Sequence, residues 1–221
     1  NLEMPFGKGL IVSGNNRFYA LDKKQFREFT TFLRGVLFNG KEDDLLSFLK
    51  RIKAPVIETR PVPAVWVAAG NCLIGDAKKT KNSMAVTALS RYGFNQLVGY
   101  TVPSWYGKGG WGTLGLLFSN HDASSLAEAW YLNNQFILDE TMTRFPKLMD
   151  VHFNSPDING IKDDPDFARG MNSAGYGMGK DQLGLIHDRD TVAFYGDPAW
   201  TARLDESRAP SPCCLLYTSP S

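Results

Sequence analysis

The spacing of hydrophobic residues changes along the chain and predicts its elements. Residues 9–20 (GLIVSGNNRFYA) form two short β-type runs around residues 13–16, which predicts a hairpin. From Lys24 the hydrophobic positions recur at helical spacing until near Gly40, and a second helix is expected over Glu42–Lys53. The proline-rich residues that follow predict an extended connector as far as Pro63.

A strand–helix–strand pattern occupies the middle of the chain. Residues 65–69 (VWVAA) are a continuous apolar run, which is typical of a strand buried on both faces of a parallel sheet. A helix is expected over Ser83–Tyr92 with Gly93 as its C-cap, and Phe94–Tyr100 predicts a second buried strand. Cys72 would then follow the carboxyl end of the first strand, the edge at which ligands bind in open parallel sheets.

The second half of the chain is predicted in four parts. Residues 103–112 (PSWYGKGGWG) indicate an aromatic and glycine-rich loop on the same sheet edge as Cys72. A long helix is expected over Ser124–Phe145, with Asp122 or Ser124 as its cap. Residues 153–182 show little periodicity and are interpreted as a long surface excursion. A final strand is expected at Asp190–Tyr195, closed by residues 196–198.

Composition narrows the class of protein. The chain has 221 residues, of which 43% are hydrophobic, enough for one α/β domain with a real core. Its 24 basic and 23 acidic residues give a net charge of +1, which does not favour nucleic acid or an anionic membrane as partner. No apolar run approaches the roughly 20 residues that span a bilayer.

The two ends of the chain look unnatural. It begins at Asn1 without a methionine or signal peptide, and residues 208–221 change composition and finish in CCLLYTSPS. This ending resembles translated adapter sequence, so residues 208–221 are predicted to be a non-native tail. Cys213 and Cys214 lie in this tail, which leaves Cys72 as the one cysteine for fold and function.

A lone cysteine has two readings. Most free cysteines are small buried hydrophobes that only pack. A thiol at the carboxyl end of a strand, flanked by Gly70 and Gly75, instead has room for a ligand backbone to approach, and a thiolate there is a nucleophile. Both readings remain open on the residue alone.

Three segments in order make the chain resemble the gingipain-like cysteine peptidases of the caspase–hemoglobinase group. They are residues 67–75 (VAAGNCLIG), residues 97–107 (LVGYTVPSWYG) and residues 195–198 (YGDP). The resemblance implies a caspase-like three-layer sandwich with a mostly parallel sheet, incomplete at its N-terminus, over residues 1–207. It also implies cysteine-type endopeptidase activity on a peptide or protein substrate, in a secreted or periplasmic setting. No cofactor and no metal are expected.

Position by position, the resemblance assigns five residues. Cys72 is the nucleophile, and its own backbone N–H would be one oxyanion donor. Gly70 and Asn71 shape the turn that carries it. Trp105 and Tyr106 match aromatic residues of the substrate pocket, although an aromatic–glycine loop can equally serve local packing alone.

The catalytic histidine of the family has no match in this chain. In the family it lies upstream of the cysteine and is followed by a glycine, whereas His121, His152 and His187 all lie downstream of Cys72. None of the three is assigned a catalytic role. Either the histidine precedes Asn1, or the protein is a non-catalytic relative that binds peptides. In both cases the 221-residue chain itself is expected to be inactive.

Two further questions stay open at this stage. A nucleotide-binding βαβ domain is a weaker alternative, because residues 107–110 (GKGG) are glycine-rich but lack the phosphate-loop pattern. Selectivity for a basic residue would require an acidic group in the pocket, and neither Asp76 nor Asp122 is singled out for that part.

Overall fold

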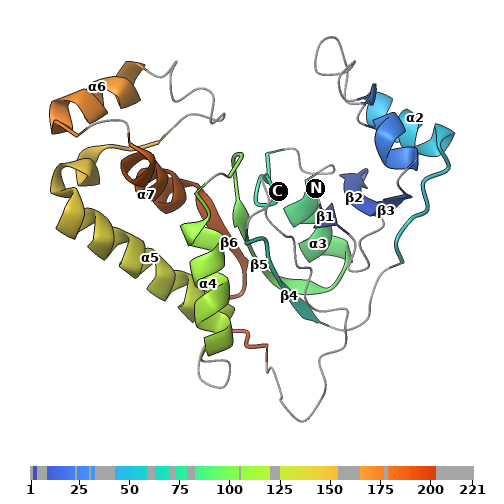
Figure 1. The fold of residues 1–221 in the computed structure, drawn as a ribbon. Helices are drawn as coiled ribbons and strands as arrows, with labels where there is room; N and C mark the ends of the chain where they lie inside the picture. The colour runs from blue at the N-terminus through green and yellow to red at the C-terminus, as the bar shows by residue number, and fades with distance from the viewer. Residues whose placement is uncertain are drawn as a thin grey trace.

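The protein is a mixed α/β fold with two small sheets (Figure 1). The computed structural model describes residues 2–3, 9–22, 24–29, 31–32, 43–58, 63–69, 73–78, 83–104, 106–119, 125–153, 165–176 and 179–202. The strands are β1 (Leu2–Glu3), β2 (Gly9–Gly14), β3 (Arg17–Asp22), β4 (Ala64–Val67), β5 (Phe94–Tyr100) and β6 (Val192–Gly196). The helices are α2 (Asp43–Arg51), α3 (Met84–Arg91), α4 (Lys108–Ser119), α5 (Leu126–Arg144), η2 (Pro146–Asp150), α6 (Pro165–Ala174) and α7 (Lys180–Thr191).

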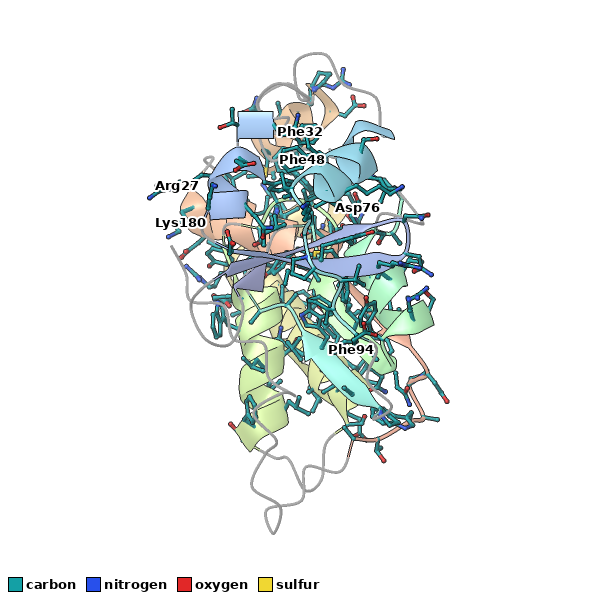
Figure 2. All side chains as sticks on the ribbon, turned by 90° about the vertical axis from the view of Figure 1, so that its right-hand side faces the viewer. Arg27, Phe32, Phe48, Asp76, Phe94 and Lys180 are labelled. Atoms are coloured by element: carbon teal, nitrogen blue, oxygen red, sulfur yellow. The ribbon has the colours of Figure 1, made fainter. Side chains whose placement is uncertain are left out.

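The predicted hairpin and its helical partners form an N-terminal unit. Strands β2 and β3 pair antiparallel across a turn at Asn15 and Asn16, both with positive φ, as a tight hairpin requires. The expected helix over Glu42–Lys53 is confirmed as α2. Phe32 and Phe48 stack with ring centroids 4.4 Å apart and lie together at the top of Figure 2. The stretch from residue 24 is helical over 24–29, and residues 33–42 lie outside the described part.

The central sheet contains the predicted βαβ unit. Strands β4 and β5 are parallel, and α3 connects them. Strand β6 pairs antiparallel with β5, with Tyr100 opposite Val192. The described sheet is therefore mixed, with one parallel and one antiparallel pair, rather than mostly parallel as expected.

Helices cover both faces of this sheet (Figure 1). On one face, Ala85 and Ala88 of α3 are buried with Trp66 of β4. The hairpin joins this side, because the N–H of Phe18 donates to the Tyr92 hydroxyl and the two rings stack. On the other face, Leu117 of α4 packs with α5 and the sheet. No helix in the described ranges is both long and apolar enough to cross a membrane.

The predicted aromatic loop is shorter than expected. Residues 108–112 form the first turns of α4, so only 101–107 connect β5 to that helix. The reason is close packing: a Cβ at Gly110 would lie 2.6 Å from the Cα of Ala69, at the end of β4. The glycines allow a helix to approach the sheet backbone, a role that composition alone does not distinguish from a loop.

Residues 153–182 are not a continuous surface excursion, as the sequence predicted. Helix α6 lies within this range and buries Phe167, Met171 and Ala174 at i, i+4 and i+7 spacing. Helix α7 follows and runs through Asp190 and Thr191, so the last strand begins two residues later than predicted. Residues 154–164 lie outside the described part.

The caps of two helices refine the prediction. Tyr92 is the C-cap of α3, and Gly93 follows it with φ of 73°. For the long helix α5 the expected cap, Asp122 or Ser124, was wrong. Ser125 caps it, with its hydroxyl accepting from the N–H of Glu128 while that carboxylate accepts from the N–H of Ser125.

Replacing this cap is expected to weaken α5. Ser125→Ala removes the acceptor for the Glu128 N–H, so the free energy of unfolding should fall by about 1 kcal/mol. Ser119→Ala is the matched control, since Ser119 is exposed at the end of α4 and should change stability by less than about 0.5 kcal/mol. Urea unfolding followed by circular dichroism measures both, and equal effects would show that the Ser125 cap contributes nothing.

Candidate functional site

The carboxyl edge of the parallel strands is the candidate site. Strand β4 runs into Ala68 and Ala69, both buried. After residues 70–72 the chain is described again at Leu73, whose N–H donates to Val102 O at 3.4 Å, and at Gly75, whose N–H donates to Tyr100 O at 2.9 Å. The two sides of the Gly-Asn-Cys segment are thus fixed at the end of β4 and beside the end of β5.

Of the five predicted site residues, Tyr106 is described. Gly70, Asn71, Cys72 and Trp105 lie outside the described residues, so their assigned roles remain predictions. Leu73, directly after Cys72, is exposed and has φ of 63°, a conformation that costs a non-glycine residue energy.

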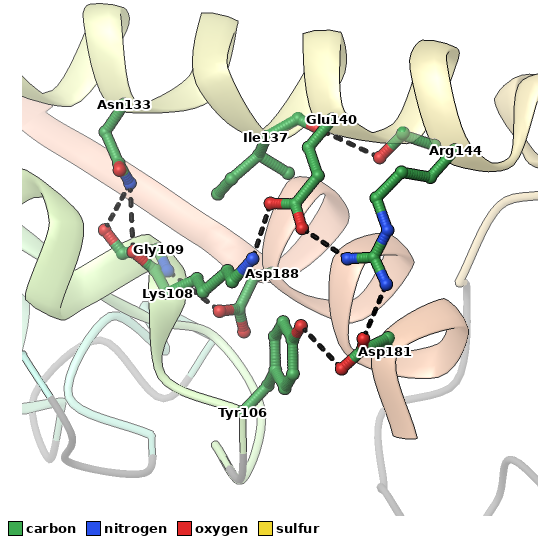
Figure 3. Close-up of polar contacts among 10 residues, drawn as sticks. Tyr106, Lys108, Gly109, Asn133, Ile137, Glu140, Arg144, Asp181 and Asp188 are labelled. Atoms are coloured by element: carbon green, nitrogen blue, oxygen red, sulfur yellow. Dashed lines mark hydrogen bonds and ion pairs between the residues drawn. The ribbon is translucent and has the colours of Figure 1, made fainter. Parts of the chain in front are cut away.

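Tyr106 contacts helix α7. Its hydroxyl donates to Asp181 Oδ1 at 3.2 Å, and its ring lies against Gly184. Lys108 Nζ stands 5.6 Å from the centre of the ring (Figure 3). Burial, followed by the charge of Asp181, raises the pKa of Tyr106 to about 12. Of the two aromatic residues predicted to line the substrate pocket, Tyr106 is therefore held in place by these neighbours.

Charged groups on three helices extend this contact (Figure 3). Arg144 of α5 donates to Glu140 at 2.6 Å and to Asp181 of α7 at 2.7 Å, and Lys108 of α4 pairs with Glu140. Hydrogen bonding from Arg144 lowers the pKa of the Asp181 carboxyl, and bonding from Lys108 lowers that of Glu140. Because the groups are partly exposed, their contribution is to geometry more than to stability.

A second polar cluster lies beneath the first and is fully buried. His187 and Asp188 of α7 have no exposed side-chain surface, and His187 Nδ1 lies 3.1 Å from Asp188 Oδ1. His187 Nε2 lies 3.1 Å from Pro103 O in the loop after β5. His187 thus lies inside a helix and joins it to that loop. Both ring nitrogens therefore lie 3.1 Å from oxygen atoms of the protein itself.

Of the other two histidines, His152 lies within the described residues. It is exposed, and its Nδ1 lies 3.7 Å from Asp190 Oδ2. His121 lies outside the described residues. One carboxylate oxygen of Asp76 accepts from the Lys78 N–H at 3.0 Å. Burial raises the pKa of Tyr195, and the charge of Asp76 is a second, smaller cause.

The buried carboxylate also occupies the start of α4. Asp188 Oδ2 accepts the N–H of Gly109 at 2.8 Å, and the Gly110 N–H donates to the Tyr100 hydroxyl at 3.2 Å. Burial and the neighbouring charge of Asp188 raise the pKa of Tyr100. A phosphate would need these same N–H groups, so the glycine-rich start of α4 is already filled by an anion of the protein itself. This argues against the nucleotide-binding alternative.

The YGDP motif of residues 195–198 has a structural role. Gln96 of β5 is buried, and its side-chain amide donates to Asp197 O and Trp200 O, both at 2.7 Å. Gly196 has φ of 113°, and a Cβ there would overlap the backbone of Asn95. The motif therefore folds the chain back across the sheet after β6.

Comparisons with known proteins give no neighbour for this chain. Neither the protein-family models, nor the curated proteins, nor the solved structures contain a match. Within the described residues, no group of three or more metal-ligating side chains is close enough to hold a metal ion.

Removing the buried charge should destabilise the protein. Asp188→Asn leaves His187 without its carboxylate and weakens the contact to the start of α4, so the free energy of unfolding should fall by about 1–3 kcal/mol. Asp139→Asn, at an exposed position of α5, is the control and should stay within about 0.5 kcal/mol. Urea unfolding measures both, and a loss below about 1 kcal/mol for Asp188→Asn would contradict the buried-pair account.

The raised pKa of Tyr106 predicts a loss of stability at high pH. An unfolded tyrosine ionises near pH 10, whereas Tyr106 in the folded protein stays protonated to about pH 12, so stability falls as the pH rises between these values. Tyr106→Phe should reduce that fall, and Tyr131→Phe, at an exposed position, is the control. Unfolding midpoints from pH 9 to 12 measure the effect, and parallel curves for Tyr106→Phe and the parent chain would refute it.

Proposed function

We propose that the protein is a cysteine-type endopeptidase of the gingipain-like kind, with Cys72 as its nucleophile. The resemblance of residues 67–75, 97–107 and 195–198 suggests the activity. The observation that carries the proposal is that the chain on both sides of Cys72 lies at the carboxyl edge of a parallel βαβ unit. This is the edge at which the nucleophile would meet a substrate.

The proposed chemistry is acyl transfer. The Cys72 thiolate would add to a peptide carbonyl, and the resulting oxyanion would be bound by backbone N–H groups including that of Cys72. Collapse breaks the peptide bond, the amine leaves with a proton from a histidine, and water then hydrolyses the thioester. That histidine and its following glycine are proposed to precede Asn1, and the complete sheet would be the caspase-like three-layer sandwich.

The decisive experiment uses a longer protein, here called the parent reading frame, which includes the sequence encoded upstream of Asn1. A peptidyl acyloxymethyl ketone should label Cys72, as mapped by mass spectrometry, and Cys72→Ala should lower peptide turnover at least about 10⁴-fold. Cys213→Ala and Cys214→Ala, made in a version of the frame that keeps residues 208–221, are matched controls and should keep full turnover. The 221-residue chain should show none, since loss of a general base alone costs about 10²–10⁴-fold.

The outcomes separate the alternatives. Label on Cys213 or Cys214 with Cys72 untouched would overturn the assignment of the nucleophile. If the parent frame binds the peptide but neither cleaves it nor reacts with the probe, the protein is the non-catalytic peptide-binding relative.

A further inference from the structure

Successive turns of helix α7 contact successive residues of the loop after β5. At the end of the helix, Thr191 O accepts from both the N–H of Thr101, at 2.8 Å, and its hydroxyl, at 3.1 Å. One turn earlier, His187 contacts Pro103 O. Nearer the start of the helix, Gly184 and Asp181 contact Tyr106. The loop therefore runs antiparallel to α7.

The helical spacing shows that these contacts belong to one stripe. Asp181, Gly184, His187 and Thr191 follow one another at intervals of three, three and four residues, which places them on the same side of an α-helix. Asp188, next to His187, binds the N–H of Gly109 and so fixes the first turn of α4 from the same side. One helix thus holds both ends of residues 101–107.

The contacts combine buried and exposed groups. His187 and Asp188 have no exposed side-chain surface, whereas the side chain of Asp181 is 47% exposed. At Gly184 an added methyl group would overlap the Tyr106 ring, with its Cδ1 at 2.6 Å. The aromatic ring therefore rests directly on the helix backbone, and this position admits no larger residue without moving the ring.

We propose that the α7 stripe of Asp181, Gly184, His187 and Thr191 is the positioning element of the aromatic loop, so that α7 sets the shape of the substrate pocket. The statement that α7 sets the shape of the substrate pocket rests on the proposed peptidase function. The statement that the stripe positions the loop does not. The stripe contains no catalytic residue: it acts through the loop that carries Trp105 and Tyr106.

The test compares two helix glycines changed to alanine. Gly184→Ala pushes on the Tyr106 ring, whereas Gly115→Ala on α4 meets nothing within 4 Å and is the matched control. Amide hydrogen exchange of residues 101–107 in the 221-residue chain should become at least about ten-fold faster in Gly184→Ala and change less than about two-fold in Gly115→Ala. The hairpin at residues 9–22 serves as internal reference. Unchanged loop exchange in Gly184→Ala would overturn the proposal.

A second variant guards against simple misfolding. Asp181→Asn changes a partly exposed side chain and weakens the hydrogen bond to Tyr106, so it should accelerate exchange in 101–107 while leaving the unfolding midpoint nearly unchanged. If Gly184→Ala does not fold, this variant decides: exchange at the parent rate in Asp181→Asn overturns the role of the stripe.

The pocket is tested in the parent reading frame. In Gly184→Ala the ratio of kcat/KM between peptides with different residues at the cleavage site should shift at least about five-fold, while alkylation of Cys72 by iodoacetamide stays within about two-fold. A loosened loop with unchanged selectivity would overturn the pocket half of the proposal. If the unmodified frame neither cleaves peptides nor reacts with the peptidyl probe, the peptidase function fails, and the exchange experiment still decides the positioning half.

Discussion

The candidate site depends on the contacts of one carboxylate, that of Asp188, which has no exposed surface. Asp188 accepts the N–H of Gly109, lies beside His187 and contributes to raising the pKa of Tyr100. A buried carboxylate is tolerated when hydrogen bonds replace its hydration, and here the Gly109 N–H at the start of α4 donates one while His187 Nδ1 lies 3.1 Å from the other oxygen. The consequence is that α4, α7 and the end of β5 share a single anchor.

The sequence predicted the elements up to β5 well, and it missed three of the helices that follow: α4, α6 and α7. The hairpin, α2, α3 and β5 were confirmed because strong hydrophobic periodicity and turn residues specify them locally. Helix α4 was missed because the glycines of its first turns resemble a loop, although Gly110 serves the approach of the helix to Ala69. Helix α6 carried a readable i, i+4, i+7 signal at Phe167, Met171 and Ala174, which the surrounding polar residues obscured.

The residues of the candidate site were likewise only partly predictable from the sequence. A motif could point to Cys72 and its neighbours, but no local pattern indicates that His187 and Asp188 are buried or that Tyr106 rests on Gly184. Those contacts join residues about 80 positions apart, and such pairing depends on tertiary packing rather than on propensity. The proposed peptidase therefore draws its nucleophile from one segment of the chain and the support of its pocket from another.

The junction between α7 and β6 limits how far the backbone at the carboxyl edge of the sheet can move. The helix ends at Thr191 and the strand begins at Val192, with no linker between them, and Val192 is already paired with Tyr100. Any sliding of the helix along its axis would pull the strand out of register, at the expense of the whole ladder from Tyr100 to Gln96. In the proposed peptidase, the backbone behind residues 101–107 would therefore be held in place by the sheet.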